Sequence, residues 1–240
     1  MEISNHIPTG EFEFNGIKLG YSSFNTDWIH QLGIVPRVIF DIGGYDAGDA
    51  IRLKEYFPYS DVFCFEADDE RCTKISEYIG KSGVIFEQRV VTSKSGVEVD
   101  FYPSICNTKD AGDTHTIGSR GGQGSAFIHA ESYRSNYPQI VQSEKPISVL
   151  AESVESICKR YQIDHIDVAH IDVEGSEYDV VWGFGEHRPT LVFLEVLDGM
   201  FKGVKPFSEL HALMKDMGYN MIKDCGTDKL YLHKPIITNQ

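Results

Sequence analysis

The sequence lacks long hydrophobic runs and an excess of basic residues. Its longest uninterrupted apolar runs, Val62–Phe65 and Leu191–Leu194, span four residues each, whereas a membrane-spanning helix needs about 20. Lys and Arg total 22 against 36 Asp and Glu, which gives a net charge of −14 and a pI near 5.0. Because nucleic acids and anionic membrane surfaces are bound through clustered Lys and Arg, we expect neither as a partner.

Two further absences concern cysteine and the N-terminus. The five cysteines include no C-x-x-C pair, and this favours reduced, mostly buried thiols over a disulfide framework or a structural zinc site. The opening stretch MEISNHIPTGEFEF has neither the basic nor the apolar segment of a secretory signal. We therefore expect a cytoplasmic protein. With 240 residues, of which 41% are hydrophobic, the chain is long enough to form one large core.

What the sequence does contain is an alternation of strand-like and helix-like segments. Residues 1–36 show no clean period and are predicted to form an N-terminal extension with a short hairpin, and residues 37–240 are predicted to form one domain. The predicted buried strands are Val38–Ile42, Asp61–Glu66, Val84–Val91, Asp167–Val173 and Thr190–Val196. Such strands alternating with helices indicate an α/β fold, a Rossmann-like, doubly wound, mostly parallel sheet. A C-terminal antiparallel hairpin is predicted to complete it.

The middle of the chain departs from this alternation. A turn at Ser93–Gly96 leads into the alternating segment Val97–Tyr102, which predicts an antiparallel ribbon with the strand before it. Residues 103–145 then carry five glycines without strong periodicity, which is typical of a functional loop or lid. In this segment we predict Ser125 and Tyr133 to bind the substrate, although the helical spacing of Tyr133 fits core packing equally well.

The turn after the first predicted strand, DIGGYDAG at residues 41–48, is the first candidate ligand site. It matches neither the phosphate-binding pattern G-x-x-x-x-G-K-[ST] nor the dinucleotide pattern G-x-G-x-x-G. Its acidic residues favour a phosphate-free ligand with a cationic amine, and S-adenosylmethionine fits this description. Glu66 ends the second strand, where a carboxylate can accept both ribose hydroxyls. The alternatives are a structural cap for Asp41 and a solvated strand-end carboxylate for Glu66.

The acidic stretch HIDVEGSE, at residues 170–177, is the second candidate. Between residues 164 and 198 there are nine Asp and Glu residues against one base. Asp172, Glu174 and Glu195 fall at the ends of apolar strands, where a carboxylate needs hydrogen-bond donors or a cation. A sulfonium with its α-ammonium would supply positive charge. A metal held by His170, Asp172 and Glu174 is the alternative, but we expect no metal because this sheet type and the lack of a second nearby histidine count against it.

Four segments together resemble one family. IFDIGGYDAG, FCFEADDE, VTSKSGVEVDFY and above all HIDVEGSEYDVVWG, spread over about Val38 to Val196, are similar in order and spacing to the FkbM family of S-adenosylmethionine-dependent methyltransferases. The resemblance implies a class I methyltransferase fold. It also implies O-methylation of a hydroxyl group on a sugar, glycan or related small acceptor. One departure is His170, because the family usually has Lys at this position.

The resemblance and the motifs yield two sets of predicted site residues. The predicted cofactor-binding residues are Asp41, Gly43, Gly44, Tyr45, Glu66, Ala67 and Asp172. The predicted catalytic residues are Glu174, His170 and Glu177. The cofactor that they imply is S-adenosyl-L-methionine.

Methyl transfer requires alignment of the acceptor oxygen with the methyl carbon and removal of the hydroxyl proton. We expect His170 or Glu174 to take this proton and Asp172 to orient the methionine end of the cofactor, but a hydrogen-bonded core histidine is the simpler interpretation of His170. Two other functions stay open. A nicotinamide oxidoreductase would share the fold and Glu66, but this sequence lacks the glycine fingerprint of such enzymes. A non-catalytic S-adenosylmethionine-binding protein would share the first motif, but it would have no use for the acidic turn.

Overall fold

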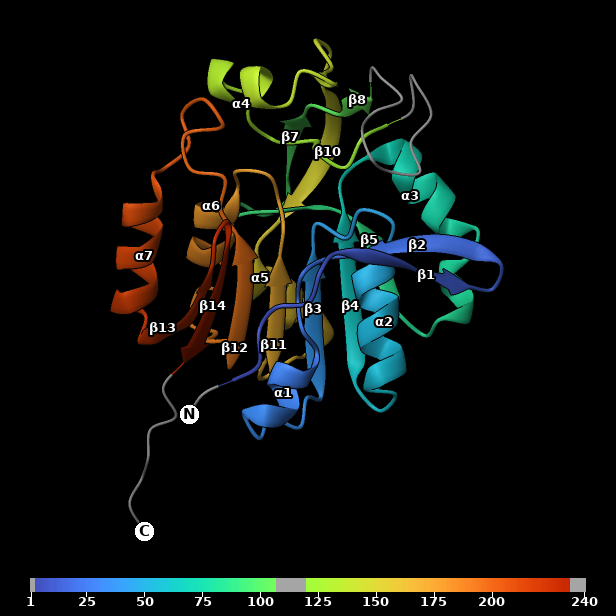
Figure 1. Cartoon of the computed structure of the whole chain (residues 1–240), viewed down its shortest axis with the longest axis vertical. Helices are drawn as coiled ribbons and strands as arrows, with labels where there is room; N and C mark the ends of the chain where they lie inside the picture. The colour runs from blue at the N-terminus through green and yellow to red at the C-terminus, as the bar shows by residue number, and fades with distance from the viewer. Residues whose placement is uncertain (1–2, 107–119, 234–240) are drawn as a thin grey trace.

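The computed structural model describes residues 3–106 and 120–233, and its centre is a seven-stranded sheet. The strand order is β13-β14-β12-β11-β3-β4-β5 (Figure 1). The strands are β3 (Val38–Ile42), β4 (Asp61–Glu66), β5 (Ile85–Gln88), β11 (Val168–Ile171), β12 (Leu191–Glu195), β13 (Tyr219–Cys225) and β14 (Asp228–His233). Neighbours from β5 to β12 pair in parallel, whereas β14 is antiparallel to both of its neighbours. The predicted fold class and its C-terminal hairpin are confirmed.

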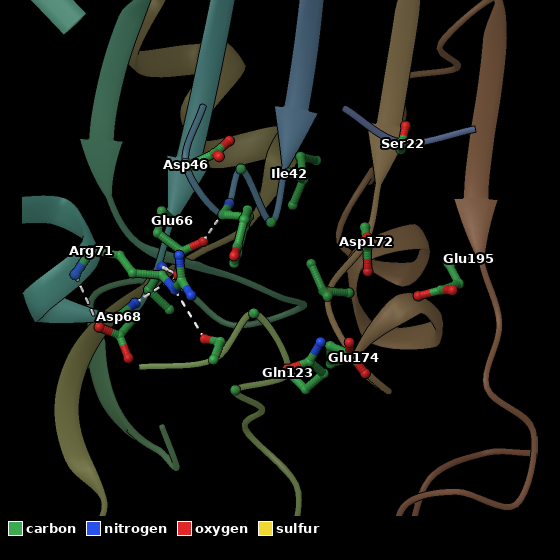
Figure 2. Close-up of a pocket in the computed structure, with 18 of the residues that line it drawn as sticks. Ser22, Ile42, Asp46, Glu66, Asp68, Arg71, Gln123, Asp172, Glu174 and Glu195 are labelled. Atoms are coloured by element: carbon green, nitrogen blue, oxygen red, sulfur yellow. Dashed lines mark hydrogen bonds between the residues drawn. The ribbon is translucent and has the colours of Figure 1, made fainter. Parts of the chain in front are cut away.

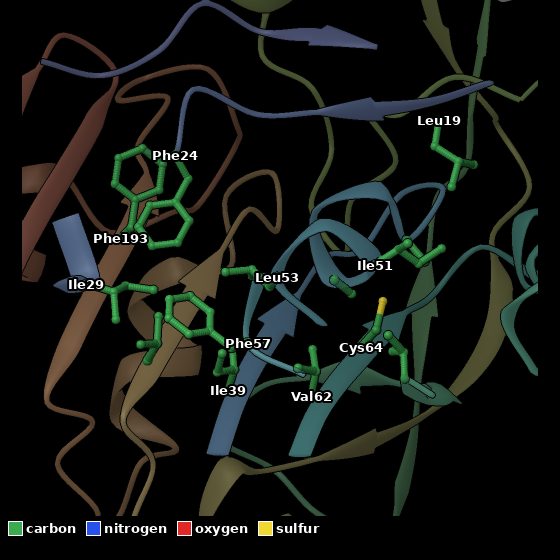
Figure 3. Close-up of a cluster of buried hydrophobic side chains, with 14 of the residues drawn as sticks. Leu19, Phe24, Ile29, Ile39, Ile51, Leu53, Phe57, Val62, Cys64 and Phe193 are labelled. Carbon is green, nitrogen blue, oxygen red and sulfur yellow. The ribbon is translucent and has the colours of Figure 1, made fainter. Parts of the chain in front are cut away.

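Helices cover both faces of this sheet (Figure 1). One face packs against α1 (Asp27–Gln31), α2 (Gly48–Tyr56), α3 (Asp69–Ser76) and a 3₁₀ turn (Ile79–Lys81), and the other against α5 (Val154–Tyr161), α6 (Glu177–Trp182) and α7 (Phe207–Asp216). Because the strands are buried on both sides, their sequences are nearly continuous apolar runs. Figure 3 shows the first of these two cores, in which each fully buried Val, Ile or Phe side chain contributes about 1.5–3 kcal/mol. None of the helices in the described parts of the chain is long and apolar enough to span a membrane.

The N-terminal segment contributes to the same core. The predicted hairpin is confirmed and is formed by β1 (Gly10–Phe14) and β2 (Ile17–Tyr21). After it, Phe24 is fully buried in the core (Figure 3). The backbone of β2 lies directly on α2, because a Cβ added at Gly48 would stand 1.8 Å from the carbonyl oxygen of Gly20. The hairpin is therefore held close to the carboxyl end of β3.

A small sheet in the order β6-β10-β7 corrects one prediction. It consists of β6 (Val90–Val91), β10 (Ile147–Glu152) and β7 (Val97–Phe101), and β10 is parallel to β6 but antiparallel to β7. The antiparallel ribbon predicted between β7 and the strand before it is wrong, and the predicted third strand is divided between β5 and β6. The physical reason is long-range packing, since apolar side chains of β6, β7 and β10 share one small core that local alternation cannot reveal.

The predicted loop at residues 103–145 carries more regular structure than expected. Its described part includes β8 (Ser104–Cys106), α4 (Glu131–Asn136) and β9 (Ile140–Gln142), and β8 pairs with β9. Residues 107–119 of this segment lie outside the described residues. In Figure 1, α4, β7, β8 and β10 stand together beyond one end of the main sheet.

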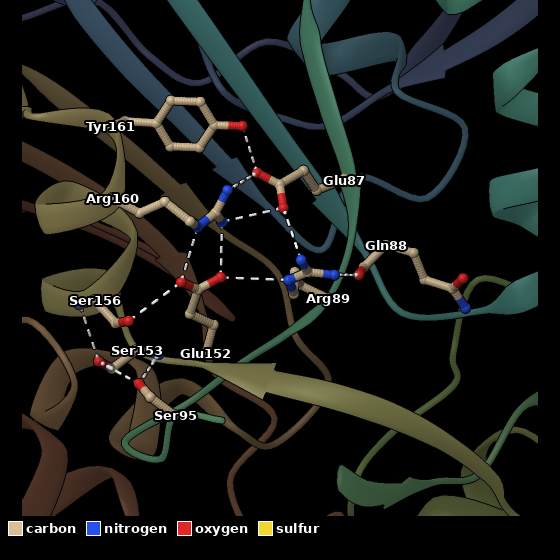
Figure 4. Close-up of polar contacts among 9 residues, drawn as sticks. All are labelled: Glu87, Gln88, Arg89, Ser95, Glu152, Ser153, Ser156, Arg160 and Tyr161. Carbon is tan, nitrogen blue, oxygen red and sulfur yellow. Dashed lines mark hydrogen bonds and ion pairs between the residues drawn. The ribbon is translucent and has the colours of Figure 1, made fainter. Parts of the chain in front are cut away.

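An ion-pair network joins the small sheet to the main sheet. The guanidinium of Arg160, on α5, donates to both carboxylate oxygens of Glu87 in β5 and to Glu152 in β10 (Figure 4). Arg89, which lies between β5 and β6, forms ion pairs with the same two carboxylates. The network therefore stabilises the junction between β5 and β6, where the chain leaves the main sheet.

Candidate active site

A pocket of about 730 Å³ opens at the carboxyl ends of β3, β4, β11 and β12 (Figure 2). Parallel sheets of this kind bind their ligands there, beside the point where the strand order reverses. The predicted site residues that line the pocket are Asp41, Gly43, Gly44, Tyr45, Glu66, Ala67, Tyr133, His170, Asp172 and Glu174. Ser125 and Glu177 are not among the lining residues.

Gly43 and Gly44 allow three strand ends to meet. Gly43 has a φ of +90°, and a Cβ there would stand 1.7 Å from the carbonyl oxygen of Asp172. A Cβ at Gly44 would stand 2.2 Å from Sγ of Cys64. The N–H groups of both glycines donate to the carbonyl oxygen of Phe65 at 2.9 Å. The turn therefore joins the ends of β3, β4 and β11 along one side of the pocket.

Glu66, at the end of β4, is oriented by backbone hydrogen bonds. Its Oε2 accepts the N–H of Tyr45 at 2.7 Å, and its Oε1 accepts the N–H groups of Ala67 and Asp68 at 2.7 and 2.8 Å. Burial raises the pKa of Glu66 to about 7, although these N–H groups act in the opposite direction. The carboxylate is held in place before any ligand binds, and Oε2 keeps an acceptor position for a ligand hydroxyl.

Arg71, on α3, lines the same half of the pocket, but the protein itself engages its guanidinium. The group donates to the carbonyl oxygens of Arg120 and Gly121 at 2.6 and 2.9 Å. It also lies 3.7 Å from the centre of the Tyr45 ring. A ligand phosphate would have to compete with these contacts, and this agrees with the prediction of a phosphate-free ligand.

Asp172, Glu174 and Glu195 form the opposite half of the pocket (Figure 2). One carboxylate oxygen from each lies within 4.8 Å of the others. Asp172 and Glu195 are hydrogen-bonded to each other, and Oε2 of Glu174 has no hydrogen-bond partner among the described residues. Burial raises the pKa of all three carboxyls, and negative neighbours add to the effect, which brings the pKa of Glu195 to about 7.

Two predicted site residues shape the loop that carries Glu174. The backbone of Glu174 is left-handed, with a φ of 52°, a conformation that is uncommon outside glycine. The hydroxyl of Ser125 donates to the carbonyl oxygen of Glu174 at 2.6 Å, and the N–H of Gly175 donates to Oε1 of Glu177 at 2.8 Å. Ser125 and Glu177 thus stabilise the conformation of this loop without lining the pocket.

Both ring nitrogens of His170 face protein groups. Nδ1 lies 2.7 Å from Oδ1 of Asp41, and Nε2 lies 3.3 Å from Oγ of Ser22. The ring also packs against Phe24 and Phe193, whose rings contact each other as well. Burial by itself lowers the pKa of His170, but the hydrogen bond and charge of Asp41 outweigh it and raise this pKa to about 9. The imidazole is therefore protonated at neutral pH.

Tyr133, on α4, borders the pocket mainly as a packing residue. Its side chain is 2% exposed, and its ring stacks on His129 with centroids 4.0 Å apart. It also contacts Phe201. These contacts agree with the core-packing interpretation of its helical spacing.

Several lining residues lay outside the prediction, among them Ser22, Arg71 and Gln123. Ser22 comes from the aperiodic N-terminal segment, Arg71 from a helix and Gln123 from the glycine-rich segment. None of them belongs to a motif with a ligand-binding spacing, so no local signal in the sequence identifies them. Glu195 did carry a signal, because it is an acidic residue at the end of an apolar strand.

Residues 41–221 match the family model described as the methyltransferase FkbM domain. This range includes the glycine turn, Glu66 and all three carboxylates of the opposite half. The chain belongs to the FkbM methyltransferase family. The resemblance that four sequence segments suggested is therefore confirmed.

This FkbM-family chain is also similar to individual proteins. It is 30% identical over 180 residues to the 2-O-methyltransferase NoeI of Sinorhizobium fredii, with 74% of this chain and 70% of NoeI covered. The structure of methyltransferase FkbM from Methylobacillus flagellatus KT has a TM-score of 0.42 at 11% identity and covers 82% of this chain and 44% of its own. Precorrin-6y C5,15-methyltransferase from Geobacter metallireducens GS-15 has a TM-score of 0.42 at 10% identity, with 82% and 78% covered. The family assignment rests on the family model and on NoeI.

Proposed function

We propose that this FkbM-family enzyme transfers the methyl group of S-adenosylmethionine to a hydroxyl oxygen of a sugar, glycan or related small acceptor. The observation that carries the proposal is a single pocket with a pre-oriented carboxylate, Glu66, on one side and three facing carboxylates on the other. O-methylation is supported by NoeI, which is named a 2-O-methyltransferase.

The residues of the pocket fit this cofactor, which supplies a methyl group on a positively charged sulfur. Oε2 of Glu66 accepts a ribose hydroxyl, and the carboxylate of Asp172 attracts the α-ammonium and the sulfonium. The guanidinium groups of Arg71 and Arg89 are both engaged by the protein. A nicotinamide dinucleotide, which brings a pyrophosphate, is therefore a poorer fit.

The acceptor hydroxyl must lose its proton on the acidic side of the pocket. In the in-line transfer the oxygen forms a bond to the methyl carbon, the carbon–sulfur bond breaks with its electron pair on sulfur, and a base takes the proton. His170 is a poor base because Asp41 and Ser22 already contact its two ring nitrogens. Glu174, whose Oε2 has no partner among the described residues, is the better placed group. Ser125 and Glu177 act as positioning residues.

Two measurements test the proposal. Calorimetry with S-adenosylhomocysteine should show binding, and labelled methyl should pass from S-adenosylmethionine to a member of a panel of sugars and oligosaccharides. Glu66→Ala removes a hydrogen bond to a charged group and should weaken S-adenosylhomocysteine binding by roughly 10- to 100-fold. Glu55→Gln, on the exposed side of α2, is the matched control and should bind normally.

Other outcomes would contradict the proposed cofactor or the proposed catalysis. Failure of the folded wild-type protein to bind S-adenosylhomocysteine, or binding of NAD in its place, would refute the proposed cofactor. Binding of S-adenosylhomocysteine without methyl transfer to any hydroxylated acceptor would indicate a non-catalytic binding protein.

A further inference from the structure

We propose that Asp172, Glu174 and Glu195 bind a hard divalent cation, of the class of Mg²⁺, Mn²⁺ or Ca²⁺, at the acceptor end of the pocket. The three side chains come from the loop after β11 and from the end of β12, and they share one half of the pocket (Figure 2). The binding of the ion can be measured by itself, whereas its role in catalysis rests on the proposed methyl transfer.

The spacing of the three carboxylates suits such an ion. One oxygen of each lies within 4.8 Å of the others. Oxygens that bind one ion at about 2.0–2.6 Å stand up to about 4–5 Å apart when they lie on opposite sides of it. Hard divalent cations prefer carboxylate oxygens over other protein ligands. Small side-chain rotations therefore suffice for the three groups to share an ion.

Glu174 provides a second, independent observation. Its side chain is buried, and its Oε2 is enclosed without a hydrogen-bond partner among the described residues. A buried carboxylate without donors is strongly disfavoured unless a cation neutralises it. The hydrogen bond from Ser125 to the backbone of Glu174 keeps this loop in place. The loop thus holds against the pocket a carboxylate with one oxygen that has no partner among the described residues.

No Lys or Arg in the described parts of the chain pairs with this cluster. None of the ion pairs formed by described Lys and Arg residues involves the three carboxylates. The two ring nitrogens of His170 are directed to Asp41 and Ser22 and not to the cluster. The cofactor's α-ammonium would bring one positive charge to a group of three carboxylates, and a divalent ion would balance them more fully.

The site differs from the metal set considered in the sequence. That set included His170, whose two nitrogens contact Asp41 and Ser22 instead. Glu195 takes the place of the histidine. The expectation of no metal rested on the sheet type and on the lack of a second histidine, but an all-carboxylate site for a hard cation requires no histidine.

A cation at this position would assist the proposed transfer in two ways. It would bind the acceptor hydroxyl, or two neighbouring hydroxyls of a sugar, and it would lower the pKa of the reacting hydroxyl. Because a carboxylate has two oxygens, Glu174 can contact the ion with one and accept the proton with the other. The acceptor oxygen would form its bond to the methyl carbon as the carbon–sulfur bond breaks, and the electron pair of the broken bond would stay on sulfur.

Titration of the chelator-treated full chain with Mn²⁺, followed by electron paramagnetic resonance, tests the site directly. We expect one bound Mn²⁺ per chain, displaced by excess Mg²⁺ or Ca²⁺. Asp172→Asn, Glu174→Gln and Glu195→Gln should each weaken Mn²⁺ binding at least tenfold. Asp228→Asn is the charge-matched control, because Asp228 is near the cluster but accepts a hydrogen bond from Ser23. It should keep one Mn²⁺ site.

Three results would overturn the inference: no binding of Mn²⁺, Mg²⁺ or Ca²⁺ to the folded wild-type chain, binding unchanged in all three variants, or competition between S-adenosylhomocysteine and Mn²⁺. The last result would assign the cluster to the cofactor's ammonium. Circular dichroism verifies folding, and three separate variants keep the test open if one of them fails to fold. S-adenosylhomocysteine binding on the same samples separates the two proposals, since binding without a cation site refutes only this one.

Discussion

The two halves of the pocket use carboxylates in opposite ways. At the end of β4, Glu66 accepts three backbone N–H groups. Across the pocket, Asp172, Glu174 and Glu195 face one another, and Glu174 has an oxygen without a partner among the described residues. A carboxylate with fixed donors is oriented in advance, whereas buried carboxylates that face one another stay destabilised until positive charge arrives. The first half therefore suits neutral hydroxyl groups, and the second suits cations.

Gly43 joins the two halves, so its replacement should have the largest effect. In Gly43→Ala the new Cβ would collide with the carbonyl oxygen of Asp172, in a backbone with a φ of +90°. We expect the free energy of unfolding to fall by about 3 kcal/mol or more, measured by urea denaturation. Gly226→Ala has the same φ but nothing within 4 Å, and it should cost only about 1 kcal/mol. Equal losses in the two variants would show that the two strand ends are not tightly joined there.

Because of Glu66, in the first half of the pocket, cofactor binding should depend on pH. Because burial raises the pKa of Glu66 to about 7, the carboxylate becomes a neutral acid below that pH and accepts ribose hydroxyls less well. S-adenosylhomocysteine affinity should fall about tenfold between pH 8 and pH 6 in calorimetry. Glu66→Gln should bind weakly at both values. Equal wild-type affinity at the two pH values would contradict this role of Glu66.

The stability of the unliganded protein should change with pH in the opposite direction, falling as the pH rises. The pKa of Glu66 is raised from 4.5 to about 7, so folding favours its protonated form. The stability that this group contributes is present below pH 4.5 and is lost as the pH rises through 7. Thermal melting of wild type and Glu66→Gln should therefore differ more at pH 8 than at pH 5, in favour of the variant. A constant difference would be evidence against a raised pKa.

In the network at Arg160, carboxylates are paired with basic side chains and not with backbone N–H groups or with one another. Changing this network should have the smallest effect of the changes considered, and the effect should be on stability. Although burial acts the other way, hydrogen bonds from Arg160 and its neighbours lower the pKa of Glu152. Arg160→Lys loses the two-pronged contacts with Glu87 and Glu152 (Figure 4). Since the Arg160 side chain is 38% exposed, the loss should be about 1 kcal/mol in urea denaturation. Lys159→Arg, exposed on the same helix, should show no change.

Local patterns in the sequence were sufficient for much of the fold. Buried apolar strands and the helices between them depend on residues a few positions apart, and so does the helix cap at Asp68, whose side chain accepts the N–H of Arg71. The same holds for the glycine turn and for Glu66 at the end of its strand. The signal is local because strand and helix periods, caps and tight turns are properties of short segments.

Long-range pairing accounts for what those patterns missed. The insertion of β10 between β6 and β7 depends on a segment about 50 residues downstream of β7. The contacts of His170 with Asp41 and Ser22 join residues 129 and 148 positions apart, and the contact with Asp41 makes a plausible base into a protonated core group. Glu195 and Glu174 become neighbours because β11 and β12 pair in register. Local sequence thus specifies which strands, turns and acidic residues this protein has. Which of those acidic residues face one another is set by the packing of distant segments, because burial and proximity arise only when the chain is folded.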